Sequence, residues 1–511
     1  MSHRPEVHTK VGVIRGLKSD DGSYNMFLGI PYGMVEKNNP FGLSKPYPPF
    51  DSPFEANNDT AASPQIEEFN KTIIGTLDCL HANIYVPKCA NKLPVLIHLH
   101  GGRFEIGFSG RYFYGPSYFM KQSIILVTFN YRLGPYGFMC LDTPEIPGNQ
   151  GLRDALSAIR WIKDNIQSFG GDADNITICG HSAGAIILGI LLTLDQDLFH
   201  KAIQMSGTIL RPGVIQQSDT EYPIKLAADL GFITDDAKKA IDFLANLDPK
   251  QVIKAHVETG VPIYPYIEKK FDNIEQIISD KATNLIKNKL KNIPILIGNT
   301  TSESILVYYH KTSDEFEHID PFNDHLKKVF NFEGNNQKIS ERIVRQFYIG
   351  DEKISANVRW GLVDFYSDFN FVYPIQDTIK EYLDQSLEVY HYEFSYNGSR
   401  NFVKKRFNVV GGGASHADEL TYLYDVSFEG DVTKDDQLMI DRLTTMWANF
   451  AKYGNPTPVV SELLPTKWLP ATKDALYYLD IGADLKLGKK PNHKRMAFWE
   501  LFYRSNKEFL K

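Results

Sequence analysis

Short apolar runs alternate with stretches of helical periodicity along most of the chain. Between residues 151 and 169, apolar side chains recur at roughly helical spacing, which predicts a helix that ends at Gly170 and Gly171. The short runs are rich in β-branched residues, as is typical of parallel strands covered on both faces. They lie at residues 93–99, 123–129, 176–179, 202–205, 293–297 and 387–394. We therefore predict an α/β fold with a mostly parallel central sheet and helices on both of its faces.

The two ends of the chain depart from this alternation. Residues 10–17 and 24–30 flank a DDGS turn and predict a small N-terminal antiparallel hairpin. Residues 38–70 are rich in Pro, Asn, Asp and Ser and predict a long irregular surface segment, and a proline-punctuated tail closes the chain. Further helical patterns lie at residues 222–247, 314–384 and 437–453. We expect one domain over residues 1–511, in which residues 314–384 form a helical insertion over one edge of the sheet.

The stretch at residues 176–184 carries the first candidate chemistry. A predicted strand at 176–179 runs into the pentad GHSAG at 180–184, and an apolar helix is predicted from Ala183 to residue 194. A serine becomes a nucleophile only when it is exposed and a base can take its proton. Gly180 and Gly184 lack the Cβ atoms that would clash in a sharp turn from strand to helix. This pattern predicts that Ser182 stands at the tip of a nucleophile elbow.

Composition and charge exclude several other classes of protein. The 511 residues are 43% hydrophobic and 23% charged, so a large core can form. The net charge of −7 and the lack of a long Lys/Arg run argue against a nucleic-acid partner. Four cysteines are too few for a disulfide scaffold. Without an apolar leader or a long apolar run, we expect no membrane span and a cytoplasmic protein, or a secreted one if a signal peptide has been removed.

A serine nucleophile needs a base and an acid that orients the base, and both should follow Ser182 in the chain, beyond strands. Glu303 lies a few residues after the strand at 293–297, in a polar loop. His416 follows a glycine-rich loop after the strand at 387–394. Taken alone, Glu303 is typical of a solvated loop glutamate, and His416 is typical of a structural histidine. His181 adjoins Ser182, but neighbouring side chains on a tight turn diverge. We therefore expect His181 to line the gorge and not to act as the base.

Backbone N–H donors for the oxyanion are expected after the strand at 93–99, where the sequence HGGRF at 100–104 fits an oxyanion loop. Its N–H groups and that of Ala183 would face the developing charge. The glycines at 411–413 have no following Lys-Ser/Thr, so a phosphate site is not expected. Glu419, near His416, has no metal-binding pattern around it. We expect neither a cofactor nor a metal.

Motifs along nearly the whole chain identify a family. They are FLGIPY at 27–32, DCL at 78–80, HGG at 100–102, NYRLG at 130–134, PGNQGL at 147–152, GHSAG at 180–184, QMSG at 204–207, GNTTSE at 298–303 and WANFAKYGNP at 447–456. Together they resemble type-B carboxylesterases, the group of the cholinesterases and of insect detoxifying and odorant-degrading esterases. The resemblance implies the α/β-hydrolase fold.

The resemblance also assigns roles to residues of this chain. It makes Ser182 the nucleophile, Glu303 the orienting acid and His416 the general base. It implies that Gly102, Arg103 and Ala183 supply the oxyanion N–H groups. It further implies a hydrogen bond from Ser206 to Glu303, a structural ion pair of Arg132 with Asp154, and a gorge lined by Phe104 and the helical insertion.

Three departures from the family pattern bear on function. Arg103 stands where the family has a third glycine, which puts a long cation in the oxyanion loop. The family's cysteine upstream of Cys79 is replaced near residues 62–64, so we expect no N-terminal loop disulfide and a reducing compartment. The first tryptophan is Trp161, so choline specificity is not expected.

The sequence thus predicts a serine carboxylesterase that works through an acyl-enzyme, as a monomer or homodimer. Its substrates would be small-molecule esters, such as xenobiotic, pheromone, odorant or lipid-type esters. Two alternatives stay open at this point. The first is an esterase that sequesters esters or organophosphates because deacylation is slow. The second is a non-catalytic binding relative.

Overall fold

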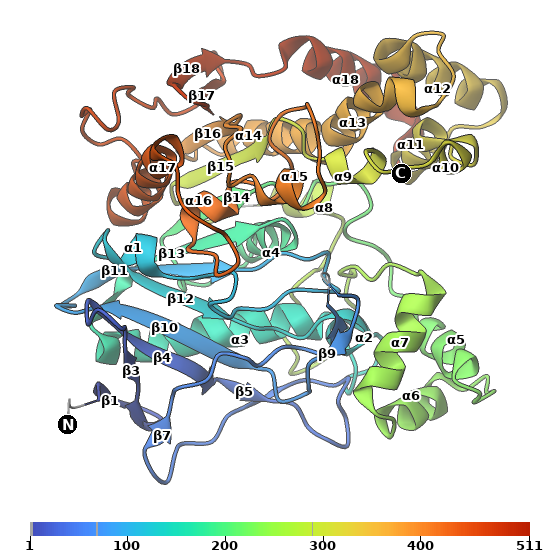
Figure 1. Ribbon diagram of the computed structural model, residues 1–511. Helices are drawn as coiled ribbons and strands as arrows, with labels where there is room; N and C mark the ends of the chain where they lie inside the picture. The colour runs from blue at the N-terminus through green and yellow to red at the C-terminus, as the bar shows by residue number, and fades with distance from the viewer. Residues whose placement is uncertain (1–3, 68–69, 289) are drawn as a thin grey trace.

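A single sheet of eleven strands runs through the protein (Figure 1), in the order β18-β17-β16-β15-β14-β13-β11-β12-β10-β4-β3. The computed structural model describes residues 4–67, 70–288 and 290–511. The strands are β3 (Leu17–Lys18), β4 (Tyr24–Pro31), β10 (His81–Pro87), β11 (Leu93–Leu99), β12 (Ile125–Phe129), β13 (Gly171–His181), β14 (Lys201–Met205), β15 (Ile295–Thr300), β16 (Val389–Phe394), β17 (Tyr477–Ile481) and β18 (Leu485–Lys489). β12, β11 and β13 to β17 pair in parallel, and the pairs toward β3 and β18 are antiparallel. The predicted mostly parallel sheet is confirmed.

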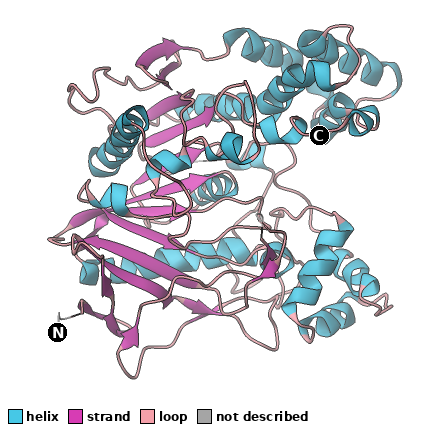
Figure 2. Cartoon of the chain, viewed as in Figure 1, coloured by secondary structure: helices cyan, strands magenta, loops and turns pink. Residues whose placement is uncertain are grey.

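Helices cover both faces of this sheet (Figure 2) because its strands carry apolar side chains on both sides. In β11, Val95 and Ile97 join one core cluster and Leu96 joins another, as the two-residue period of a strand requires. The first cluster includes residues of α3 (Gln150–Asn165), α4 (Ala183–Leu191) and α14 (Tyr373–Asp384). The second includes residues of α1 (Ser117–Met120) and α17 (Lys434–Tyr453). Each fully buried aliphatic side chain of this kind contributes about 1.5–3 kcal/mol.

The predicted N-terminal hairpin is only partly right. Leu17–Lys18 pair with β4, but β2 (Gly12–Arg15) pairs instead with β1 (Glu6–Thr9) and with β7 (Phe54–Glu55) in a small separate sheet. At Gly16 a Cβ atom would lie 2.3 Å from the Met26 carbonyl oxygen. The chain therefore passes from one sheet to the other through a contact that only glycine permits.

The proline-punctuated tail contains two sheet strands and a helix that the sequence analysis did not predict. β17 and β18 lie between Pro470 and Pro491, so no proline interrupts their pairing, and α18 (His493–Ser505) follows. β10 was also not predicted, although it pairs with both β4 and β12. The segment at 38–70 is largely irregular, as predicted, and residues 68 and 69 lie outside the described residues.

The predicted insertion is helical and forms its own layer at the upper right of Figure 1. It holds α10 (Ser313–Glu317), α11 (Pro321–Val329), α12 (Gly334–Ile349), α13 (Arg359–Ser367) and a π-helical turn, η3 (Asp368–Val372), ahead of α14. Its apolar residues pack against Trp499 and Phe502 of α18 in a third core cluster. Since one sheet draws strands from residue 17 to residue 489, we keep the proposal of a single domain.

The helices at 222–247 are α5 (Tyr222–Asp229) and α6 (Ala237–Ala245), and α7 (Pro249–Thr259) follows them. No helix within the described part of the chain is both long and apolar enough to cross a lipid bilayer.

Candidate active site

The turn between β13 and α4 holds Ser182 in a backbone conformation that few residues adopt. Its φ is 54° and its ψ −118°, which lies outside the common regions for an L-residue. A Cβ on Gly180 would lie 2.4 Å from the Gly184 carbonyl oxygen, and one on Gly184 would lie 2.0 Å from that of Leu99. The two glycines therefore let the helix start directly against the sheet. The predicted strand, turn and helix are all present at this position.

Glu303 lies just beyond the carboxyl end of β15, two strands from the elbow. Its side chain is fully buried, and its Oε1 accepts hydrogen bonds from the Ser206 hydroxyl at 2.6 Å and the Thr300 N–H at 2.8 Å. Its Oε2 lies 2.6 Å from His416 Nδ1. The predicted contact of Ser206 with Glu303 is thus present, and the carboxylate is fixed on both oxygens.

His416 sits in the loop between α15 (Phe402–Arg406) and α16 (Leu420–Leu423), downstream of β16, and its imidazole is about one-quarter exposed. The Asp418 carboxylate holds this loop by accepting hydrogen bonds from the backbone N–H groups of Ser415 and Val403. Burial raises the pKa of Asp418 to about 6, and these two donors act against the rise. With Nδ1 turned to Glu303, Nε2 is the ring nitrogen available to a hydroxyl group.

Ser182, Glu303 and His416 all line one cavity of about 360 Å³. They come from the carboxyl ends of neighbouring parallel strands, where ligands bind in open α/β sheets. No hydrogen bond joins the Ser182 hydroxyl to the His416 ring in the described structure, and such bonds often tighten only when substrate is bound. The structure therefore brings the three residues together, and their catalytic roles stay a prediction.

His181 also lines this cavity but is not suited to act as a base. Burial lowers its pKa well below the usual value, and the charge of His416 lowers it further. Its ring centroid lies 4.7 Å from that of His416. A neutral imidazole at this distance packs against the His416 ring and restricts its position.

The loop after β11 has three successive residues with positive φ: Gly102, Arg103 and Phe104. A Cβ on Gly101 would lie 2.9 Å from the Cβ of Ser182, so this loop runs directly against the elbow. The backbone N–H groups of Gly102, Arg103 and Ala183 make no hydrogen bond among the described residues. Three donors without an internal partner next to Ser182 are what an oxyanion site requires.

The side chains of Arg103 and Phe104, which are neighbours in this loop, point in different directions. The Arg103 side chain is 66% exposed, lines the cavity, and its Nε lies 3.8 Å from the Glu105 carboxylate. The prediction that Phe104 lines the gorge is wrong, because its ring is 1% exposed and packs edge-on against Phe138 in the core. The left-handed backbone at both residues turns one side chain outward and the next inward.

Two other expectations can be compared directly with the structure. Arg132 and Asp154 form the expected ion pair, with both side chains fully buried and Nε 2.6 Å from Oδ2. Cys79 is a free cysteine, as are Cys89, Cys140 and Cys179, which agrees with the expectation that the family's N-terminal loop disulfide is absent from this chain.

The sequence analysis missed three residues of the site. Arg211 and Phe371 line the cavity, and Glu419 is a fully buried carboxyl group close to Glu303. Neither Arg211 nor Phe371 belongs to a motif that the chain displays. Glu419 was weighed only as a metal ligand, although its position three residues after His416 could have placed it beside the site.

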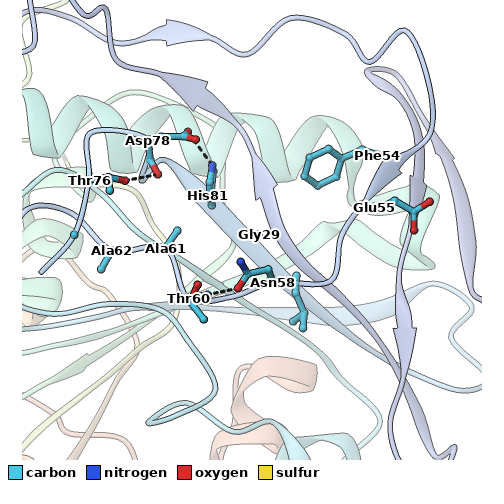
Figure 3. Close-up of a pocket in the computed structure, with 12 residues that line it drawn as sticks. Gly29, Phe54, Glu55, Asn58, Thr60, Ala61, Ala62, Thr76, Asp78 and His81 are labelled. Carbon is cyan, nitrogen blue, oxygen red and sulfur yellow. Dashed lines mark hydrogen bonds and ion pairs between the residues drawn. The ribbon is translucent and has the colours of Figure 1, made fainter.

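A second cavity, of about 440 Å³, lies elsewhere, between β4 and the loops before β10 (Figure 3). It contains an acid and base pair, since His81 Nε2 lies 3.2 Å from an Asp78 carboxylate oxygen. In the part of the chain that the structure describes, the one hydroxyl group bonded to this pair is that of Thr76, which donates to the Asp78 backbone carbonyl and not to His81. The cavity therefore lacks the nucleophile and base contact that the chemistry of an ester hydrolase needs.

Comparisons with known proteins agree with this geometry. The model of the Carboxylesterase family matches residues 3–499. Esterase FE4 of Myzus persicae is 28% identical, with 93% of this chain and 88% of that protein covered. Juvenile hormone esterase of Heliothis virescens is 29% identical over 88% of this chain and 85% of its own.

A solved structure is similar over the whole chain. The crystal structure of juvenile hormone esterase from Manduca sexta, with OTFP covalently attached, has a TM-score of 0.85 and 26% identity. It covers 98% of this chain and 100% of its own. The architecture is the α/β-hydrolase fold, and small-molecule esters are the substrates that this family suggests. The chain belongs to the carboxylesterase family and is a carboxylic ester hydrolase.

Proposed function

We propose that the protein is a serine carboxylesterase in which Ser182 is the nucleophile, His416 the general base and Glu303 the acid that orients it. The observation that carries this proposal is the 2.6 Å contact between His416 Nδ1 and Glu303 Oε2 in the cavity that Ser182 lines. This contact fixes the tautomer of the imidazole and directs its other nitrogen away from the carboxylate.

The reaction proceeds in two halves. His416 Nε2 takes the Ser182 proton as the hydroxyl oxygen attacks the ester carbonyl, and the N–H groups of Gly102, Arg103 and Ala183 stabilise the oxyanion. The imidazolium then protonates the leaving alcohol, which gives an acyl-enzyme. In the second half His416 takes a proton from water, the hydroxide displaces the acyl group, and the proton returns to Ser182.

Apolar esters suit the walls of this cavity. Phe113, Phe402 and Leu306 line it from three separate segments of the chain. We propose xenobiotic, pheromone, odorant or lipid-type esters as the substrate class. The esterase and juvenile hormone esterase names of the relatives support this range without selecting within it.

A short 4-nitrophenyl ester tests the proposal. We expect a burst of nitrophenol followed by steady turnover, and Ser182→Ala should lose both. Ser218→Ala, which removes a hydroxyl outside the cavity, should keep both and serves as the control. Equal activity in the wild type and in Ser182→Ala would overturn the assignment of the nucleophile.

Slow deacylation is a second candidate function, and one observation favours it. Arg103 holds a φ of 57° in the oxyanion loop, a conformation that is uncommon for a residue with a Cβ. A less adaptable loop would leave the second half-reaction slow, and the protein would then sequester esters. Stopped-flow kinetics separates the two candidates, because sequestration gives a full burst with almost no steady-state slope.

A further inference from the structure

One guanidinium group in the cavity of Ser182 has no anionic partner among the described residues. Arg211 follows β14, is half-buried and lines the cavity. Among residues 4–67, 70–288 and 290–511, no carboxylate lies within ion-pair distance of it. Two other arginines with little exposure, Arg132 and Arg153, each pair with a carboxylate at 2.8 Å or less. Within the described part of the chain, the Arg211 guanidinium therefore lines a largely apolar cavity without a carboxylate partner.

An aromatic ring connects this cation to the proposed base. The guanidinium carbon of Arg211 lies 5.0 Å from the ring centroid of Phe371, in cation–π contact. Phe371 also contacts His416, whose ring centroid lies 5.1 Å from its own. Since Phe371 is only 6% exposed, its ring fixes the direction of the guanidinium. Arg211 thus lies one aromatic ring from the reacting atoms, within reach of a substituent on the substrate.

Arg103 is a second cation that acts on the same part of the cavity. Burial raises the pKa of Tyr264, and the charges of Arg211 and Arg103 both act against this rise. Both arginines line the cavity, so they stand around one phenol ring. Arg103 has a distant partner in Glu105, at 3.8 Å, and most of its side chain faces solvent.

Glu303, the buried acid of this cavity, is engaged by other groups. It accepts hydrogen bonds from Ser206 and the Thr300 N–H and contacts His416, and its side chain is fully buried. Arg211 is half-buried in the wall of the cavity, and a planar carboxylate on a substrate matches the donor geometry of its guanidinium.

We propose that the ester this enzyme hydrolyses carries an anionic group, such as a carboxylate, that binds Arg211 while Ser182 attacks the ester carbonyl. This inference rests on the proposed function and names the substrate class of the same site. The anionic group lies on either the acyl part or the alcohol part of the ester, and Arg103 adds attraction at the mouth of the cavity.

A matched pair of esters measures the preference. The first probe is the mono-4-nitrophenyl ester of adipic acid, which has a free carboxylate, and the second is its methyl ester, which is neutral. A hydrogen bond to a charged group contributes about 1.5–3 kcal/mol, and each 1.4 kcal/mol changes a binding constant tenfold. We expect kcat/KM for the anionic probe to exceed that for the neutral probe by about tenfold or more.

Variants locate the preference on Arg211. Arg211→Gln should lower the ratio of the two kcat/KM values by about tenfold or more, and Arg211→Lys should retain part of it because the charge remains. Arg359→Gln is the matched control, since Arg359 also stacks on an aromatic ring, 5.3 Å from Tyr309, but does not line the cavity. The ratio of the two kcat/KM values in Arg359→Gln should equal the ratio in the wild type.

A second pair of esters identifies which part of the substrate carries the charge. 4-Acetoxybenzoate places a carboxylate on the leaving alcohol, and its methyl ester is neutral. If only this pair depends on Arg211, the anionic group belongs to the alcohol part. If only the adipate pair does, it belongs to the acyl part.

The outcomes separate this inference from the proposed function. Hydrolysis that depends on Ser182, with equal ratios in the wild type and in Arg211→Gln for both pairs, would overturn the inference alone. A ratio that falls equally in Arg211→Gln and Arg359→Gln would overturn it too, because the effect would then be one of overall charge. No Ser182-dependent hydrolysis of any probe would overturn the proposed function and this inference with it.

Discussion

Glu303 and Glu419 are two neighbouring buried carboxyl groups, and within the described residues the Glu303 oxygens have hydrogen-bond partners whereas those of Glu419 have none. Glu303 accepts from Ser206 and Thr300 and contacts His416, whereas neither oxygen of Glu419 makes a hydrogen bond within the described structure. Burial raises the pKa of Glu419 well above its usual value, and the charge of Glu303 raises it further. Burial thus favours the neutral form of Glu419, whereas the Glu303 carboxyl group has hydrogen-bond donors on one oxygen and the imidazole on the other.

The Glu419→Gln variant should become more stable relative to the wild type as the pH rises. A carboxyl group whose pKa is raised by folding binds more protons in the native state, so its contribution to stability falls as the pH rises above the unfolded value. The difference in the free energy of unfolding between the variant and the wild type changes by at most about 1.4 kcal/mol per pH unit. Thermal unfolding at about pH 5 and about pH 8 measures the difference. Glu258→Gln, at an exposed side chain, is the control, and a pH-independent difference for Glu419→Gln would contradict the expectation.

Ser206→Ala should lower kcat by about tenfold to a hundredfold, because groups that orient a catalytic residue contribute on this scale. The variant removes the 2.6 Å hydrogen bond to Glu303 without touching the substrate. Glu303→Gln should have a larger effect, about 10⁴-fold, since the amide stabilises the wrong imidazole tautomer. The pH profile of kcat distinguishes positioning from a general loss of structure. An unchanged profile and rate in Ser206→Ala would remove its positioning role.

Gly184→Ala should destabilise the protein by about 3 kcal/mol or more, because the new Cβ would overlap the backbone of a central strand. That atom would lie 2.0 Å from the Leu99 carbonyl oxygen. Gly430→Ala is the matched control, since nothing lies within 4 Å of its Cβ position. Urea unfolding of both variants checks the difference. Equal stability of the two would mean that the elbow does not need glycine at this position.

Asp154→Asn should destabilise the protein by about 3–5 kcal/mol, because it leaves the Arg132 guanidinium charged and buried without its partner. Glu6→Gln breaks the exposed ion pair with Arg15 and should change stability far less than Asp154→Asn does. Chemical denaturation measures both changes. Similar small effects would show that burial does not strengthen the Arg132 pair.

The sequence predicted the central strands and the elbow well because their physical requirements are local. A strand buried on both faces is mostly apolar, as at residues 95–97 of β11 and 295–297 of β15, and the turn at Ser182 tolerates only glycine at residues 180 and 184. β17 was missed although apolar residues alternate at Leu479 and Ile481, because the surrounding prolines dominated the interpretation.

The walls of the cavity could not be predicted in the same way. Phe104 was expected in the gorge, but a positive φ at Arg103 and Phe104 decides which side chain points inward, and no periodicity reports on φ in a loop. Arg211 and Phe371 meet across many residues of intervening chain. Only the folded sheet brings the ends of β14 and the helical insertion to the same cavity.

The order of the strands also has a consequence for synthesis. β13 presents Ser182 early, but β16 and the loop that carries His416 are added much later, and β17 completes that side of the sheet from near the end of the chain. A growing polypeptide that stops before residue 416 holds a serine hydroxyl with no base to activate it. If Ser182 and His416 have the proposed roles, ester cleavage needs both of these distant segments, and a polypeptide truncated between them is not expected to hydrolyse esters.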